Sequence, residues 1–501
     1  MGEHTSHSSL GNRIRGEHVL PLQQFVTRKS YHWFVVATVC VGAFMAALDA
    51  SIVTVALPTL VHAFHQSMSN IEWVAVAYLL TLTALLTMFG RIADMVGRRQ
   101  MYTAGFSVFI IGSALCGAAV SLPMLLISRV LQASGAAMLQ ANSVAIITAA
   151  VPSEQRGKAI GFQGSAQAIG LSLGPAIGGV LIAWLGWRSI FYVNVPVGII
   201  GTILAALILP RDHVNHVRQR FDYLGAILMA PALVFLLLAL SDGNAKGWLS
   251  SAILLDLGLA VGLGVAFYFW EKLNSSPLVD LRLFKIGIFT WGNISGLLSY
   301  AVMFGVLFLT PFYLERLGRF EPASTGVLLT PVPIAMMLIA PMSGHWADRF
   351  GGKMLTVVGM VLSAVGAGIL IFVTKQPNLM QIIVGLALVG FGLGLFTPPN
   401  NSSVMGSVPK ERLGVAGGIL NMARSLGMSL GVTFAGALYG IFMIMHHQNP
   451  DAETGHGLLT SFRGTFVGIT VLAIVTVLIS FLRGEVKHKP NEKIEHEPLE
   501  W

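Results

Sequence analysis

The chain has 501 residues, of which 54% are hydrophobic and only 11% are charged. Soluble domains carry roughly 25% charged residues, so the composition excludes an ordinary soluble protein and indicates one that lies in a membrane. The formal net charge is +8, but the basic residues are concentrated in particular loops, so the charge does not indicate nucleic-acid binding.

Fourteen apolar segments follow one another along the chain, and each is long enough to cross a bilayer as a helix. The apolar residues form continuous runs and not the stripe of a soluble helix, so an all-α polytopic membrane protein is predicted. The segments cover residues 33–57, 72–92, 101–120, 123–150, 159–185, 189–209, 223–240, 251–270, 288–311, 324–346, 353–374, 378–402, 411–443 and 459–483.

The distribution of basic residues predicts the orientation of the chain. With residues near a segment end counted with the adjoining loop or tail, 23 of the 31 Lys and Arg residues lie in the two tails or in loops after even-numbered segments. Six lie in loops after odd-numbered segments, and two lie well inside segments. This positive-inside pattern places both termini in the cytoplasm. No cleavable signal peptide is expected, because residues 1–32 lack an apolar core followed by a cleavage site.

The chain contains an internal repeat. Residues 151–159 are similar to residues 408–416, and residues 90–99 are similar to residues 344–353. Both copies fall on the same predicted side of the membrane, which indicates a parallel repeat of six-helix units. The predicted organisation is an N-terminal tail, a six-helix bundle, a linker with two extra transmembrane helices, a second six-helix bundle and a C-terminal tail, at residues 1–32, 33–209, 210–287, 288–485 and 486–501.

Two motifs carry a resemblance to a known family. Gly90-Arg-Ile-Ala-Asp-Met-Val-Gly-Arg-Arg99 resembles the major facilitator signature G-x-L-a-D-r-x-G-r-r/k between helices two and three. Gly170-Leu-Ser-Leu-Gly-Pro-Ala-Ile-Gly-Gly179 resembles the antiporter signature G-x-x-x-G-P-x-x-G-G of helix five. The first motif departs from the family at Ile92 and Met95, where Leu and a basic residue are usual.

Two further motifs narrow the resemblance. Residues 48–58 are similar to the helix-one motif of fourteen-helix drug:proton antiporters, with Thr54 where Asn is common, and Arg129 begins the helix-four motif R-x-x-Q-G-x-G-a-a, with Ala133 in place of the first Gly. Over residues 33–485 the chain therefore resembles these antiporters, which include bacterial multidrug and quaternary-ammonium exporters. The resemblance implies a major facilitator fold with 14 transmembrane helices arranged 6+2+6 and a location in the inner (plasma) membrane.

Two intramembrane charges are the candidate proton-coupling residues. Asp49 is the one charge in its apolar segment, and burying an acid there costs roughly 2.5–3.5 kcal/mol, so a function is expected. An apolar surround favours the neutral carboxyl, which could then carry a proton. The resemblance assigns Arg129 a part in proton transfer. The alternatives are a structural hydrogen bond for Asp49 and pairing of Arg129 with a backbone carbonyl.

A polar face on the fourth segment predicts part of the substrate cavity. Arg129, Gln132 and Gln140 recur at helical spacing, and lipid would not solvate such a face. Arg424 corresponds through the repeat to Gln167, and it contacts either substrate or a carboxylate, or has a structural role. The candidate cavity residues are Asp49, Gln132, Gln140, Gln163, Gln167 and Arg424.

The two signature motifs supply candidate gating residues. A carboxylate in the short loop can dock at the positive N-terminus of a helix and close the cytoplasmic side, although basic loops also simply set topology. Glycines spaced by four allow another helix to approach closely, and Pro175 favours a bend, although tight packing alone explains this pattern as well. The candidates are Gly90, Asp94, Gly97, Arg98, Arg99, Asp348, Gly170, Gly174, Pro175, Gly178 and Gly179.

These features predict a proton-coupled exporter of amphipathic, often cationic, compounds that works by alternating access. The expected partners are a small-molecule substrate, protons and the lipid bilayer, with no cofactor, no metal and no nucleic acid, and a monomer is plausible. Phosphate-loop, zinc-protease and serine-hydrolase motifs are absent, so no enzyme is expected. The rivals are a dedicated exporter of one metabolite and a non-transporting scaffold or sensor. Asp256 and Glu315 are expected to be structural.

Overall fold

The computed structural model describes residues 30–66, 68–210, 221–274, 276–320, 322–445 and 456–482, and all regular secondary structure within these ranges is helical. This confirms the all-α prediction. The predicted tails lie outside the described residues, apart from residues 30–32. The boundaries predicted for the bundles and the linker stay predictions.

The helices of the N-terminal half occupy the first two fifths of the chain. They are α3 (Tyr31–Phe64), α4 (Met68–Val96), α5 (Arg98–Gly117), α6 (Leu122–Ala150), η1 (Ser153–Gln155), α7 (Arg156–Leu185), α8 (Ser189–Tyr192) and α9 (Asn194–Ile208). Two further long helices follow, α10 (Tyr223–Lys246) and α11 (Ser251–Leu273).

The helices of the C-terminal half begin after a short 3-10 turn, η2 (Leu281–Lys285). They are α12 (Gly287–Arg316), α13 (Pro322–Leu328), α14 (Pro331–Phe350), α15 (Gly352–Ile369), η3 (Leu370–Phe372), α16 (Leu379–Gly406), η4 (Lys410–Arg412), α17 (Leu413–Met445) and α18 (His456–Leu482).

The number of membrane spans agrees with the predicted fourteen. Within the described residues, 13 helical segments are long and apolar enough to cross a membrane, and α7 adds a fourteenth when its two arms count as one span. The arms of α7 meet at an angle of 43° between Gly174 and Ile177, at the position where Pro175 predicts a bend. Nothing further is described for the Pro175 side chain.

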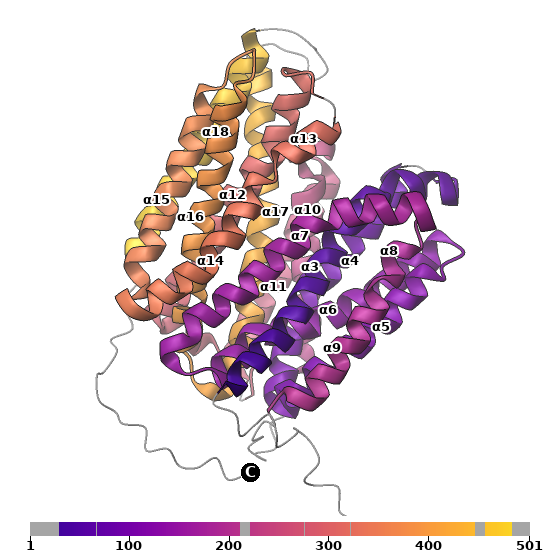
Figure 1. Ribbon diagram of the computed structural model, residues 1–501, viewed down its shortest axis with the longest axis vertical. Coiled ribbons are helices and arrows are strands. Elements are labelled where there is room, and N and C mark those ends of the chain that lie inside the picture. The colour runs from indigo at the N-terminus through magenta and orange to yellow at the C-terminus, as the bar shows by residue number, and fades with distance from the viewer. Residues whose placement is uncertain are drawn as a thin grey trace, which may run out of the picture.

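The halves form two helical bundles that converge at one end and diverge toward the other (Figure 1). The converging end carries Arg98, Arg99, Lys410 and Arg412, and we call it the basic end. We call the contact region between the two halves the join. Helix α10 lies beside it, because α10 packs against α4 of one half and against α17 of the other, as well as against α11. Helix α11 is peripheral, with only 11% of its span buried.

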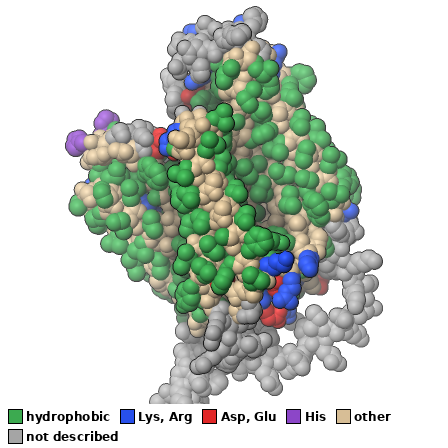
Figure 2. Space-filling model, turned by 180° about the vertical axis from the view of Figure 1, so that it is seen from behind, with side chains coloured by type: hydrophobic (Ala, Val, Ile, Leu, Met, Phe, Trp, Pro, Cys, Tyr) green, Lys and Arg blue, Asp and Glu red, His purple; other side chains and the backbone are tan. Residues whose placement is uncertain are grey.

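Apolar side chains cover the flanks of the molecule. Isoleucine, leucine and tryptophan side chains are largely exposed there, for example Ile127 at 72% and Trp184 at 83%. Figure 2 shows these green flanks, with Lys, Arg, Asp and Glu gathered at the lower end of the view. Such a surface suits a lipid environment, in which hydrocarbon solvates the flanks and water solvates the ends.

Candidate functional site

Asp49 lies in the middle of α3 and is completely buried. Its Oδ2 atom accepts a hydrogen bond from Arg129 Nη1 on α6, at 2.7 Å. Its Oδ1 atom accepts two more, from Gln132 Nε2 of α6 and from Asn194 Nδ2 at the start of α9, each at 2.8 Å. Three donors from two helices therefore surround the carboxylate, which is the arrangement that stabilises a buried negative charge.

Arg129 is held as firmly as its partner. Its Nε donates to the backbone oxygen of Val74 on α4 at 3.1 Å, and its Nη1 also lies 2.6 Å from Gln132 Oε1. The guanidinium carbon lies 4.1 Å from the ring centre of Tyr78, a distance suited to a cation–π contact. The backbone-carbonyl pairing that the sequence analysis gave as an alternative for Arg129 is therefore present. Arg129 also pairs with a carboxylate, and its predicted part in proton transfer stays a prediction.

Gln132 connects this pair to a third helix. Its Nε2 atom also donates to Ser113 Oγ on α5 at 2.6 Å, and its side chain is fully buried. Asp49 and Gln132 are therefore sealed inside the N-terminal half in this conformation, whereas the sequence predicts that both line the substrate cavity. The reason is that Arg129 and Asn194 satisfy the carboxylate locally. Their roles stay predictions.

Helix α7 sets the position of the α3 segment that carries Asp49. A side chain added at Gly170 would meet the backbone of Phe44, one at Gly174 would overlap Ser51, and one at Gly178 would meet Ile52. Ser51 Oγ also donates to the Gly170 oxygen at 3.3 Å. The antiporter-like glycines therefore seat α3 on either side of Asp49, as their spacing predicts for close helix packing.

Gly179 differs from the other glycines of that motif, because a side chain added there would meet nothing within 4 Å.

Arg424 links the two halves. It lies on α17, and its Nη1 and Nη2 atoms donate to Gln167 Oε1 of α7 and to Gln140 Oε1 of α6, each at 2.7 Å. Asn421, one turn earlier on α17, donates to the backbone oxygen of Gln140 at 2.9 Å. Three predicted cavity residues thus meet at the join, and Gln163 is buried on α7 nearby in the chain.

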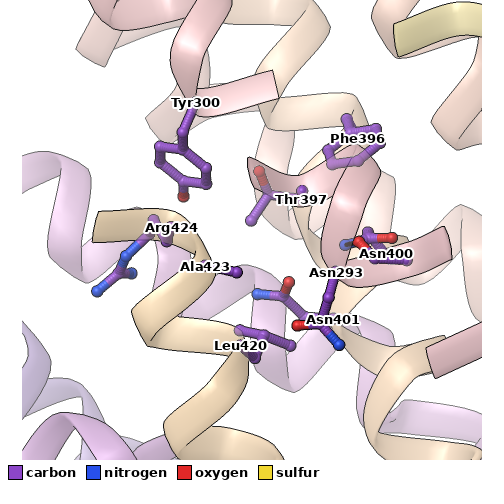
Figure 3. Close-up of a pocket in the computed structure, with 11 residues that line it drawn as sticks. Asn293, Tyr300, Phe396, Thr397, Asn400, Asn401, Leu420, Ala423 and Arg424 are labelled. Atoms are coloured by element: carbon purple, nitrogen blue, oxygen red, sulfur yellow. Dashed lines mark hydrogen bonds between the residues drawn. The ribbon is translucent and has the colours of Figure 1, made fainter. Parts of the chain in front are cut away.

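A cleft beside Arg424 contains polar residues that the sequence analysis did not single out. It lies between α12, α16 and α17, and Figure 3 shows its side chains. The lining consists of Gly292, Asn293, Gly296, Tyr300, Phe396, Thr397, Asn400, Asn401, Leu420, Ala423 and Arg424. The run Thr397-Pro-Pro-Asn-Asn401, inside an otherwise apolar segment, was the signal that could have found part of it.

Asp94 closes the basic end between the halves. Its Oδ1 and Oδ2 atoms accept hydrogen bonds from the backbone N–H groups of Gly414 and Val415, at 2.8 and 3.0 Å. These groups form the first turn of α17, where the helix dipole is positive. Arg98 Nη2 donates to Asp94 Oδ1 at 3.0 Å and to the Lys410 oxygen at 2.5 Å. Asp94 therefore docks at a helix N-terminus, as the sequence predicts. The predicted loop is wrong, because Asp94 lies in the last turn of α4 and Arg98 and Arg99 begin α5.

Glycine residues let the backbones meet at this end. A side chain added at Gly90 of α4 would overlap the carbonyl of Gly414, and one added at Gly344 of α14 would overlap the carbonyl of Gly157 on α7. We call these two backbone contacts, Gly90 with Gly414 and Gly344 with Gly157, the glycine seams. Each connects one half to the other, and the two lie in corresponding parts of the internal repeat. Nothing is described for the side chain of Asp348, so its predicted part in the second seam stays a prediction.

The remaining motif residues shape the turn between α4 and α5. Gly97 has φ of +104°, a left-handed backbone that a residue with a side chain rarely adopts. Arg99 Nη2 donates to the backbone oxygen of Ala206 on α9 at 2.5 Å. These two residues therefore hold the turn in place within the N-terminal half, while Asp94 and Arg98 cross to the other half.

Sequence reasoning missed Asn194, Ser113 and Tyr78. Each is an uncharged residue in an apolar segment, so only the packing of α4, α5 and α9 onto Asp49 and Arg129 brings them to the site. A polar residue at the start of a half-helix was the available signal for Asn194.

Two bundles of membrane-spanning helices, with a buried polar cluster inside one bundle and a cleft inside the other, define a solute transporter. The model of the Major Facilitator Superfamily matches residues 39–431 and 292–501, and the chain belongs to that superfamily. It is a multi-pass membrane protein that handles small molecules.

Curated relatives span nearly the same length. The chain is 36% identical over 454 residues to the riboflavin transporter RibZ of Clostridioides difficile, which covers 90% of this chain and 97% of the relative. It is 32% identical over 404 residues to the multidrug resistance protein Stp of Mycobacterium tuberculosis, covering 80% and 75%. The tetracenomycin C resistance and export protein of Streptomyces glaucescens is 30% identical over 406 residues, covering 81% and 76%.

Solved structures support the same fold. The human organic anion transporter MFSD10 matches with a TM-score of 0.62 and 18% identity, over 90% of this chain and 99% of that one. The proton:xylose symporter XylE matches with a TM-score of 0.63 and 15% identity, over 91% and 96%. At these identities the likeness concerns the fold alone.

Proposed function

We propose that this protein is a proton-coupled secondary transporter that exports amphipathic compounds by alternating access. The observation that carries the proposal is the Asp49–Arg129 ion pair, which is buried among polar side chains in the N-terminal half. An ion pair buried in a membrane is expensive and adds little stability by itself. A carboxylate that binds and releases a proton gives the pair a use that a scaffold would not need.

The closed basic end suggests which state of the cycle this conformation represents. If the positive-inside orientation holds, the basic end and both termini lie in the cytoplasm of a cell with an inner (plasma) membrane. The Asp94 contact and the two glycine seams then close the cytoplasmic side. Substrate would leave and a proton would enter from the opposite side of the join.

Proton entry would require the ion pair to separate. In this conformation Oδ1 of Asp49 accepts two hydrogen bonds and Oδ2 accepts one from Arg129, and protonation would remove the negative charge that these donors stabilise. Protonation neutralises Asp49 and frees Arg129, and the resulting rearrangement of α3 and α6 would be transmitted to the seams through α7. Each proton moving inward gains about 2.3 kcal/mol per 100 mV of membrane potential.

The test measures transport of a compound by protein reconstituted in the inside-out orientation in vesicles, with and without an imposed pH gradient. In this orientation export appears as uptake into the vesicle. We expect uptake to require the gradient, and each addition of substrate to move protons in the opposite direction. Transport that is unchanged when the gradient is collapsed would contradict proton coupling.

A second candidate is the transport of one metabolite and not of many drugs. Two observations favour it: the relative covered over 97% of its length is named a riboflavin transporter, and the cleft carries the amides of Asn293, Asn400 and Asn401. Amide groups recognise polar ring edges. A binding panel of riboflavin, tetracenomycin C and quaternary-ammonium compounds separates the two candidates by how many of them bind.

A further inference from the structure

The central charges of the two halves differ in how they are balanced. Arg129 is paired with Asp49, so the N-terminal cluster is neutral overall. Arg424 has no carboxylate within ion-pair distance among the residues that the structure describes. Its partners, Gln140 and Gln167, are neutral amides. The join between the halves therefore carries one uncompensated positive charge inside the membrane.

The cleft next to this charge is lined by amide side chains and aromatic rings, and no acidic side chain lines it. Its lining includes three asparagines, the rings of Tyr300 and Phe396, and no Asp or Glu. Figure 3 shows Arg424 extending from α17 to one side of the cleft, with Asn293, Asn400 and Asn401 on the other. The charge and the amides can thus contact different parts of a single ligand.

Several polar atoms at the cleft have no hydrogen-bond partner within the described part of the chain. They are Asn293 Oδ1, Thr397 Oγ1 and Arg424 Nε. Asn293 is only 8% exposed and uses its Nδ2 on the backbone of its own helix, so its oxygen is left to accept from a ligand. Buried polar atoms without partners are rare and call for an occupant.

From these contacts we infer that the cleft is a binding site for a flat ring system that is neutral or anionic, and not for an organic cation. A guanidinium stacks on flat rings and pairs with anionic oxygens, and the uncompensated charge of Arg424 repels a cation. In this closed conformation the cleft encloses only about 10 Å³, so the edge of a ring enters it only when α12, α16 and α17 separate. The inference rests on the proposed transport function and names the substrate class of its site.

The charge preference also follows from the state of Asp49. Cationic substrates are predicted from the sequence because Asp49 is an intramembrane acid. In the structure that acid is sealed and already paired, so a cation would have to displace Arg129 to reach it.

The experiment uses two probes that share a xanthene ring and differ in charge, anionic fluorescein and cationic rhodamine 123. Binding of each to the full-length protein in nanodiscs is measured at pH 8 without a gradient. We expect fluorescein to bind roughly tenfold more tightly or better, because hydrogen bonds to a charged group are the stronger ones. Equal or tighter binding of rhodamine, or binding of neither dye, would overturn the inference.

Variants assign the preference to the cleft. Arg424→Gln should abolish the preference, whereas Arg424→Lys should retain it, because the charge remains. Asn293→Asp keeps the shape of the side chain but adds a negative charge, so it should shift the preference toward rhodamine. The control is Lys375→Gln, which removes a positive charge from an exposed loop and should change nothing. A preference that survives Arg424→Gln would reject the site.

The proposed function fails on different results. Dye binding requires neither export nor a gradient. If the protein prefers fluorescein but moves no protons, the proposed binding site is supported and proton coupling is rejected. If the protein exports rhodamine 123 with proton coupling and Arg424→Gln does not change this export, proton coupling is supported and the proposed binding site is rejected.

Discussion

The side-chain amide of Asn194 donates a hydrogen bond to Asp49 Oδ1 at 2.8 Å, across a sequence separation of 145 residues. Asn194 is the first residue of α9, and Val193 separates it from the short α8. The donor is therefore placed by a helix break and not by a continuous span. A movement of α9 relative to α3 would change the number of donors on the carboxylate, which links Asp49 to the packing of the whole N-terminal half.

Replacing Asp49 by Asn should abolish coupling and also destabilise the protein. The variant cannot exchange a proton, and it leaves the buried Arg129 without a counter-charge, at a cost of about 3–5 kcal/mol. We expect a lower Tm in detergent and no substrate-induced pH change in proteoliposomes.

A double variant separates these two effects. Asp49→Asn with Arg129→Gln removes both charges, so the Tm should recover toward that of the unmodified protein while coupling stays absent. Asp256→Asn is the control acid and should leave coupling intact. If Asp49→Asn still couples and Asp256→Asn does not, Asp256 and not Asp49 is the coupling acid.

Asp94→Asn should weaken closure of the basic end. It removes the negative charge that accepts from two N–H groups of α17, a contribution of between about 0.3 and 2 kcal/mol. The distance between spin labels at Glu154 and Glu411, in a background without Cys40 and Cys116, should shift toward longer values, and turnover should fall while binding persists.

The matched control for this variant is Asp242→Asn. Asp242 forms an exposed ion pair with Lys246 at the C-terminal end of α10, remote from the α4–α17 contact. It should change neither the label distance nor the turnover. Unchanged values for Asp94→Asn itself would remove Asp94 from the gate.

Gly90→Ala should prevent the closed conformation altogether, because the added methyl group would overlap the Gly414 carbonyl. Backbone cannot move aside as a flexible side chain can, so we expect loss of transport with membrane insertion retained. Gly258→Ala on α11 is the control, since a side chain there meets nothing within 4 Å. Normal turnover in Gly90→Ala would show that the seam is not required.

The orientation of the chain predicts the outcome of a reporter experiment. A reporter fused after Trp501 should behave as cytoplasmic, and one placed between residues 446 and 458 should behave as external. An external C-terminus would contradict the positive-inside assignment and an even number of spans.

Local patterns in the sequence were enough to predict the helical class, the span count and the α4 side of the α4–α17 contact, although not its partners on α17. Asp94 was identifiable because it lies in a short motif whose chemistry, a carboxylate beside a helix start, is local. Asp49 and Arg129 were identifiable because isolated charges in apolar segments are conspicuous. The break of α7 followed from Pro175.

Partnerships between distant helices could not be predicted in this way. That Asp49 and Arg129 neutralise each other, and that Arg424 is left without an acid, depends on the packing of α3, α6, α7 and α17. The cleft formed by Asn293 and Asn400 was missed because uncharged amides do not stand out in a membrane sequence. Periodicity identifies a polar face but not the helix that it meets.

At Gly90 and Gly344 the main chain of one half lies directly against the main chain of the other. Contacts of this kind do not open by a rotamer change, so while they hold they leave little room for a file of water molecules. A transporter driven by protons must insulate the gradient that drives it. Placing two glycine seams at corresponding positions of the repeat would provide that insulation at the basic end, and both would have to part before ions or substrate could pass.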